Sequence, residues 1–143
     1  MITFSNSIAI DRPVSDVFAY LSDLENVPEW NWAIDDTTKT TPGDPGVGTR
    51  YRQTRSTPRP VTEELEITAL DEGNRLEVVG TLAEVPVRLT YLVDETEAGT
   101  RLANRVDLEP QGGMRLVAQL VSGRIERSVA ENLGQLKSRL ERA

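Results

Sequence analysis

The sequence lacks two residue types that carry much of protein chemistry: its 143 residues include no cysteine and no histidine. Without cysteine the chain forms neither a disulfide nor a thiolate nucleophile. Without histidine it has no Ser-His-Asp triad and no ordinary zinc site. The stretch PGDPGVG, residues 42–48, lacks the lysine and hydroxyl of a phosphate-binding loop. We therefore expect no metal and no other cofactor.

Long hydrophobic runs are also missing. No run of eighteen apolar residues exists, so no membrane span is expected. The opening MITFSNSIAI has no basic segment and no continuous apolar stretch, which argues against a secretory signal and predicts a cytoplasmic protein. A net charge of −7, spread along the chain, disfavours nucleic acid as a partner. Arginine outnumbers lysine fourteen to two, which is typical of a GC-rich bacterial genome.

What is present fits one domain spanning residues 1–143, with 38% hydrophobic residues. Residues 113–143 show the 3.6-residue period of a long amphipathic helix about 40 Å long. A helix of this length can lie across a sheet of many strands, and we expect it to do so with a space left between helix and sheet. Its apolar stripe comprises Val117, Val121, Ile125, Val129, Leu133, Leu136 and Leu140.

Strands and turns are predicted for most of the remaining chain. Residues 2–10 alternate as a strand with one buried face. A short helix follows over residues 13–21, with Asp11 as its cap, and then an irregular or helical piece over residues 23–32. Hairpin-length gaps separate the later strands and indicate an antiparallel meander. These strands cover residues 34–41 (at an edge), 49–56, 61–70, 75–82, 85–94 and 102–109.

This order resembles the START-related SRPBCC superfamily of polyketide cyclases, dehydrases and lipid-transport proteins. The resemblance rests on IAIDRPVSDVFAYLSDLENVPEW, on GVGTRY and on the closing helix. It implies an α+β helix-grip fold like that of the birch-pollen allergens. In that fold a curved antiparallel sheet of about seven strands surrounds the long helix, with two short helices after the first strand. It further implies a cavity between sheet and helix that accepts an apolar or amphipathic small molecule.

Polar residues that interrupt the inward faces of the strands are the candidate ligand contacts. An unpaired buried polar group costs about 1–3 kcal/mol, so each needs a partner. Asn6 and Asn104 could instead bond one another or the backbone across the sheet. The tyrosines could donate to a ligand carbonyl or belong to the core or the rim. The set is Asn6, Tyr51, Gln53, Glu63, Tyr91 and Asn104.

Glu63 is the candidate for catalysis, because an inward carboxylate in an apolar surround has its pKa raised toward neutrality. A salt bridge to Arg52, Arg55 or Arg88 would explain it without catalysis. The arginines at 50, 52, 55 and 59 are interpreted as a solvated strand face rather than an anion site.

Two further groups complete the candidate ligand site. Trp30 and Trp32 could form the lip of the pocket, or one of them could fill the core. Val121 and Ile125 belong to the helix face that turns toward the cavity. Gly123 and Gly134 interrupt the helix, either for close packing or as a hinge that admits cargo.

Three functions remain open at this level. The leading hypothesis is binding of a hydrophobic or aromatic small molecule, lipid-like or polyketide-like. The second is a polyketide cyclase or dehydratase that uses Glu63 and a tyrosine for proton transfer. The third is a protein-interaction module with a filled, closed interior.

Overall fold

A computed structural model describes residues 1–57 and 59–143 and shows one antiparallel sheet with three α-helices. The strand order is β1-β7-β6-β5-β4-β3-β2. The sequence-predicted order of elements is therefore confirmed. The elements are β1 (Ile2–Ile10), α1 (Val14–Ser22), the 3-10 turn η1 (Leu24–Asn26), α2 (Val27–Trp30), β2 (Ile34–Lys39), β3 (Arg50–Arg55), β4 (Val61–Asp71), β5 (Arg75–Leu82), β6 (Val85–Thr96), β7 (Gly99–Leu108) and α3 (Met114–Arg142).

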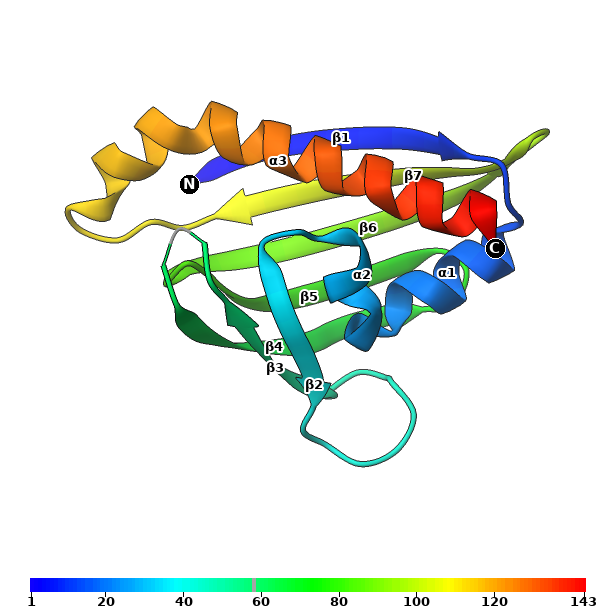
Figure 1. Ribbon diagram of the computed structural model, residues 1–143, viewed down its shortest axis with the longest axis horizontal. Coiled ribbons are helices and arrows are strands. Elements are labelled where there is room, and N and C mark those ends of the chain that lie inside the picture. Colours follow the sequence, from blue (N-terminus) through cyan, green and yellow to red (C-terminus); the bar gives the residue numbers. More distant parts are fainter. Residues whose placement is uncertain (58) are drawn as a thin grey trace.

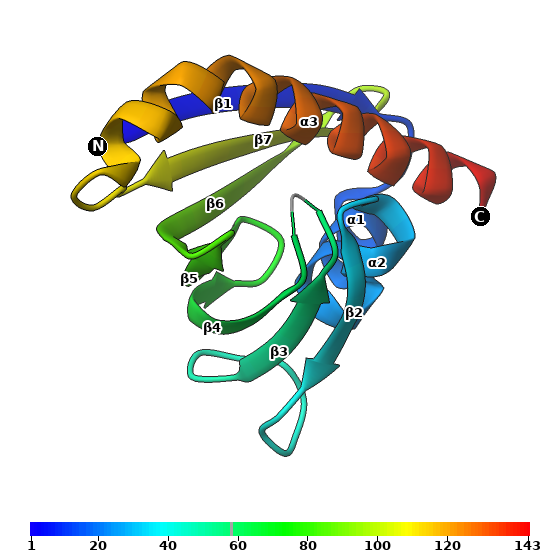
Figure 2. The same ribbon diagram turned by 60° about the vertical axis from the view of Figure 1, so that its left-hand side comes forward.

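The sheet curves so that α1, α2 and the C-terminal half of α3 lie on its concave side (Figure 1, Figure 2). Consecutive strands from β2 to β7 are hydrogen-bonded neighbours, and β1 closes the order beside β7. Gly80 of β5 pairs in register with Leu65 of β4, and a Cβ atom there would lie 2.4 Å from the Glu64 carbonyl oxygen. Only glycine fits this close approach of the two strands.

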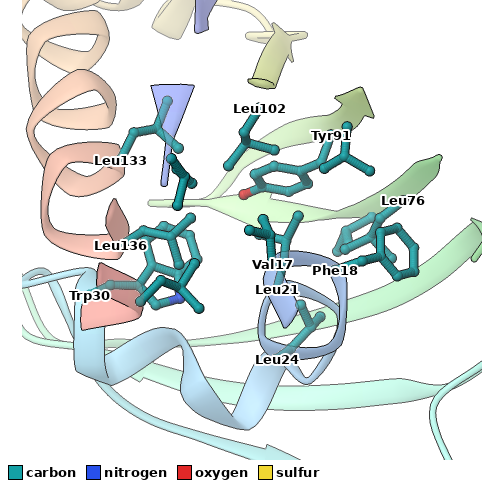
Figure 3. Close-up of a cluster of buried hydrophobic side chains, with 14 of the residues drawn as sticks. Val17, Phe18, Leu21, Leu24, Trp30, Leu76, Tyr91, Leu102, Leu133 and Leu136 are labelled. Carbon is teal, nitrogen blue, oxygen red and sulfur yellow. The ribbon is translucent and has the colours of Figure 1, made fainter. Parts of the chain in front are cut away.

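The main core lies where the two short helices and the end of α3 meet the sheet. Val17, Phe18 and Leu21 of α1 are buried there, and Leu133 and Leu136 of α3 join them (Figure 3). A second, smaller cluster at the other end of the sheet is built around Val106 and Leu108. Apolar side chains at strand and helix periods thus fill both ends of the concave face.

The apolar stripe of α3 is covered only in part, and the expectation that its whole length packs on the sheet is wrong. Leu133, Leu136 and Leu140 are buried, whereas Val117 is 48% exposed and Leu120 is 77% exposed. The helix contacts the edge strand β1 and α2 instead of crossing the sheet. Its first turns therefore extend past the sheet without a covering layer (Figure 1).

Polar contacts reinforce this asymmetry by anchoring the C-terminal end of α3. Nζ of Lys137 donates to the Ala9 carbonyl at 2.6 Å, and the Asp11 amide donates to Oε2 of Glu141 at 2.8 Å. Asp11 therefore binds α3 through its backbone. It does not cap α1, whose N-cap Pro13 provides no side-chain hydrogen bond.

Neither helical glycine touches a neighbour. A Cβ atom built on Gly123 or Gly134 would meet nothing within 4 Å. The close-packing explanation for these glycines is therefore wrong, and Gly123, which is exposed, carries the cost of glycine in an exposed helix.

Replacing Gly123 by alanine should stabilise the protein by about 1 kcal/mol, because alanine loses less backbone entropy in a helix and meets no obstacle here. Urea unfolding followed by circular dichroism measures this free energy. Gly80→Ala is the matched control and should destabilise, since its methyl group would collide with the Glu64 backbone. A neutral or destabilising Gly123→Ala would contradict the interpretation.

Candidate functional site

A cavity of about 80 Å³ lies between the concave face of the sheet and the middle of α3. Its walls are mostly aliphatic. Half-buried Val27, Asn31, Thr81, Leu82 and Val129 mark its rim. The remaining lining residues are Leu24, Trp30, Ile34, Gln53, Arg55, Leu65, Val78, Val87, Leu89, Tyr91, Asn104, Asn132 and Leu133.

Three polar side chains face the cavity from β6, β7 and α3. Tyr91 and Asn104 are paired in register on neighbouring strands, and Nδ2 of Asn104 donates to the Thr90 carbonyl at 3.2 Å. Burial raises the pKa of the Tyr91 hydroxyl, so this group remains a neutral donor near pH 7. Oδ1 of Asn132 is buried and accepts no hydrogen bond from the residues that the structure describes.

Asn6 continues the same row, because it pairs in register with Asn104. Asn6 is half-buried and lies outside the cavity lining. Within residues 1–57 and 59–143 its Nδ2 has no partner, so the two asparagine side chains do not bond one another. The alternative that one of them bonds the backbone across the sheet applies to Asn104 alone.

A hydrogen-bonded network centred on Glu63 forms the β3–β4 wall. Oε1 of Glu63 accepts from Nε2 of Gln53 at 2.7 Å. Oε2 accepts from Nε of Arg55 at 3.1 Å and from the Ala83 amide at 2.6 Å. Gln53 and Arg55 line the cavity, whereas Glu63 lies behind them with no exposed side-chain surface. The Glu63 carboxylate thus orients two side chains of the wall.

This network includes a two-residue turn between β5 and β6. Ala83 and Glu84 adopt φ angles of 49° and 73°, as the inner residues of a tight hairpin turn must. Left-handed backbone is costly for residues other than glycine. The hydrogen bond from the Ala83 amide to Glu63 helps to hold it in place.

The interpretation of the arginines at 50, 52, 55 and 59 as a solvated strand face is wrong for Arg55. It differs in parity from Arg50 and Arg52, so its side chain points inward and is 8% exposed. Arg50 and Arg52 do face solvent, where they pair with glutamates of β4. The salt bridge considered for Glu63 is formed with Arg55.

The two tryptophans lie in different environments. Trp30 lines the cavity, whereas Trp32 is 60% exposed and lies outside it. Tyr51 is buried outside the lining, and its hydroxyl has no partner with hydrogen-bond geometry among the described residues. Burial, together with the charge of Asp23, raises the pKa of Tyr51 to about 12, although the nearby backbone of Leu24 opposes the shift. Tyr51 is thus placed in the core.

The helix contributes different residues from those expected. Val121 and Ile125 are half-buried and lie before the cavity begins, whereas Val129 and Asn132 line it. Asn132 was missed, although it interrupts the apolar stripe three residues after Val129. A polar residue at this helical spacing is the signal by which the sequence could have identified it.

A larger groove of about 650 Å³ lies elsewhere, between α1, the 40–48 loop and the β4–β5 turn. Carboxylates of Asp23, Glu25, Asp44 and Glu72 line it, and no unpartnered buried atom marks it among the residues described. We therefore take the smaller cavity as the candidate site. The described residues contain no cluster suited to a metal ion and no helix long and apolar enough to cross a membrane.

Glu63→Gln should destabilise the protein by about 3–5 kcal/mol, because it leaves the Arg55 charge buried and unpaired. Glu64→Gln is the matched control on the same strand. It breaks the exposed pair with Arg52 and should cost less than about 1 kcal/mol. Chemical unfolding of both variants measures the difference, and equal stabilities would refute the buried pair.

Comparisons with known proteins agree with this architecture. The family described as "Polyketide cyclase / dehydrase and lipid transport" matches residues 1–141. No curated protein matches the sequence.

Similar solved structures cover nearly the whole chain at low identity. Ara h 8.0201 superposes with a TM-score of 0.78 at 16% identity, covering 99% of each chain. TTHA0849 from Thermus thermophilus gives 0.77 at 20% identity, covering 97% of each. The di-domain ARO/CYC StfQ of the steffimycin biosynthetic pathway gives 0.77 at 15% identity, covering 98% of this chain and 50% of StfQ. These likenesses confirm the helix-grip fold, and the family match shows that the chain belongs to the polyketide cyclase / dehydrase and lipid transport family.

Proposed function

We propose that the protein binds an apolar or amphipathic small molecule in the cavity between the sheet and α3. The observation that carries the proposal is Oδ1 of Asn132, a buried acceptor that lacks a partner among the described residues and belongs to the lining of an otherwise largely aliphatic cavity. Leaving such an atom unsatisfied costs about 1–3 kcal/mol. A ligand with a hydroxyl or amide group would satisfy it.

The size of the cavity bears on how a ligand is held. Pockets that enclose drug-sized ligands measure about 300–1,000 Å³, more than the 80 Å³ found here. A larger ligand therefore requires movement of a wall, and the α3 wall at Val129 and Asn132 follows directly on the least supported part of the helix, its first half. Its exposed Val117 and Leu120 bury little surface, and the side-chain bonds that join α3 to β1 and α2 involve residues near its C-terminal end.

The lining favours binding over catalysis. Its described residues include no aspartate, glutamate or lysine. The raised pKa of Tyr91 makes that hydroxyl a poor base near neutral pH. Both oxygens of Glu63 accept hydrogen bonds, and its side chain lies behind the lining. A cyclase or dehydratase that uses Glu63 and a tyrosine is therefore the weaker proposal, although StfQ is an ARO/CYC and the family includes cyclases.

Native mass spectrometry of the protein, isolated from the cells that naturally make it, tests the binding proposal directly. We expect a population of molecules heavier than the bare chain, whose extra mass is released as an apolar compound on denaturation. Recovery of the bare chain alone, together with no thermal stabilisation by any compound of a hydrophobic ligand panel, would count against the proposal.

Val129→Phe should abolish stabilisation by such a ligand, because the larger ring fills the rim of the cavity. Val117→Phe is the matched control on the same helix, outside the cavity, and should leave ligand binding unchanged. Thermal unfolding with and without ligand measures both, since a ligand at 100 times its Kd stabilises by about 2.7 kcal/mol. If both variants respond like the original protein, the ligand binds elsewhere.

A further inference from the structure

Arg55 offers unused hydrogen-bond donors to the cavity. Its Nε atom is committed to Glu63 at 3.1 Å. Its two Nη groups donate to no residue of the described chain, and neither is sealed from the cavity or solvent. A guanidinium has five N–H donors in a fixed plane. Four of them are therefore available at the β3 wall, on a side chain held in place by Glu63.

The charge of this wall is already balanced. Arg55 is the charged residue in the described lining, and the Glu63 carboxylate directly behind it has the opposite sign. A ligand carboxylate bound to Arg55 would bring a second negative charge beside Glu63 into an apolar cavity. Burying an uncompensated ion costs several kcal/mol. A carbonyl oxygen accepts the same N–H groups without adding charge, and bonds from a charged donor are the stronger kind.

We infer that the cavity selects uncharged ligands with a carbonyl oxygen directed at the Nη groups of Arg55, and that it discriminates against carboxylates. The inference rests on the proposed function and narrows its ligand class. Glu63 acts here as a positioning residue: it orients the guanidinium and cancels its charge. Asn132 supplies an acceptor on the helix side, so a hydroxyl at the far end of the ligand would complete the match.

Acetophenone, benzoate and ethylbenzene form a matched set of probes with one ring and a similar size. Titration of the isotope-labelled protein, followed by nuclear magnetic resonance of backbone amides around Thr81 and Asn132, measures each affinity. We expect acetophenone to bind at least tenfold more tightly than benzoate and more tightly than ethylbenzene. Benzoate binding as tightly as acetophenone would overturn the inference and leave the carrier function intact. No response to any of the three would count against the carrier function itself.

Two variants test whether the preference among the three probes comes from Arg55 or from the apolar lining of the cavity. Replacing both Arg55 and Glu63 by methionine removes donors and charge together, a change that is often tolerated for buried pairs. It should abolish the preference for acetophenone over ethylbenzene, and a retained preference would refute the role of Arg55. Glu63→Gln removes only the balancing charge and should shift the preference toward benzoate at least tenfold. If this variant does not fold, the double variant and the original protein still decide the matter.

Discussion

The wall of the cavity formed by β3, β4 and the β5–β6 turn depends on a single buried carboxylate. Glu63 has no exposed side-chain surface, so its charge must be met by protein donors, and three are supplied by β3 and by the β5–β6 turn. Satisfying Glu63 therefore dictates the inward direction of Arg55, the orientation of the Gln53 amide and the position of the turn at Ala83. One electrostatic requirement thereby joins β3, β4 and the turn into one wall of the cavity. That wall is polar because the side chains that donate hydrogen bonds to the Glu63 carboxylate belong to it.

The opposite wall follows a different constraint, because the polar contacts that anchor α3 lie near its C-terminal end. Near its C-terminus the helix buries Leu136 and Leu140 and donates from Lys137 to β1. Toward its N-terminus it presents Val117 and Leu120 to solvent. Local opening requires the least free energy where few apolar contacts are lost. Opening of the first half of α3 would leave the main core intact, because that core is built around α1 and the last turns of the helix, but it would uncover Ala118 and Ile125.

Short-range periodicity in the sequence predicted which strand residues face inward and how the strands follow one another. It did not predict how elements that are distant in the sequence pack together. Alternation by two placed Glu63, Asn104 and Tyr91 on the inward face, and the gap lengths between strands indicated the meander. Periodicity could not reveal that α3 runs along β1. The buried length of the apolar stripe of α3 was therefore overestimated. Trp30 and Trp32 are two residues apart in an irregular segment where no period applies, and only tertiary packing distinguishes them. Arg55 was misassigned because it was grouped with arginines of the opposite parity.

Membership of the family leaves carrier and cyclase equally open, since one fold supports both and the decision lies in the cavity wall. Here Glu63, the carboxylate that is hydrogen-bonded to the lining residues Gln53 and Arg55, is held by the wall itself. Making Glu63 available for proton transfer would require breaking its bonds to Gln53 and the Ala83 amide and leaving Arg55 without its counter-charge. The feature that suggested a catalyst from sequence therefore acts in the structure as a support for hydrogen-bond donors. Donors that are fixed, paired in charge and turned toward an aliphatic cavity suit the recognition of a neutral molecule better than its transformation.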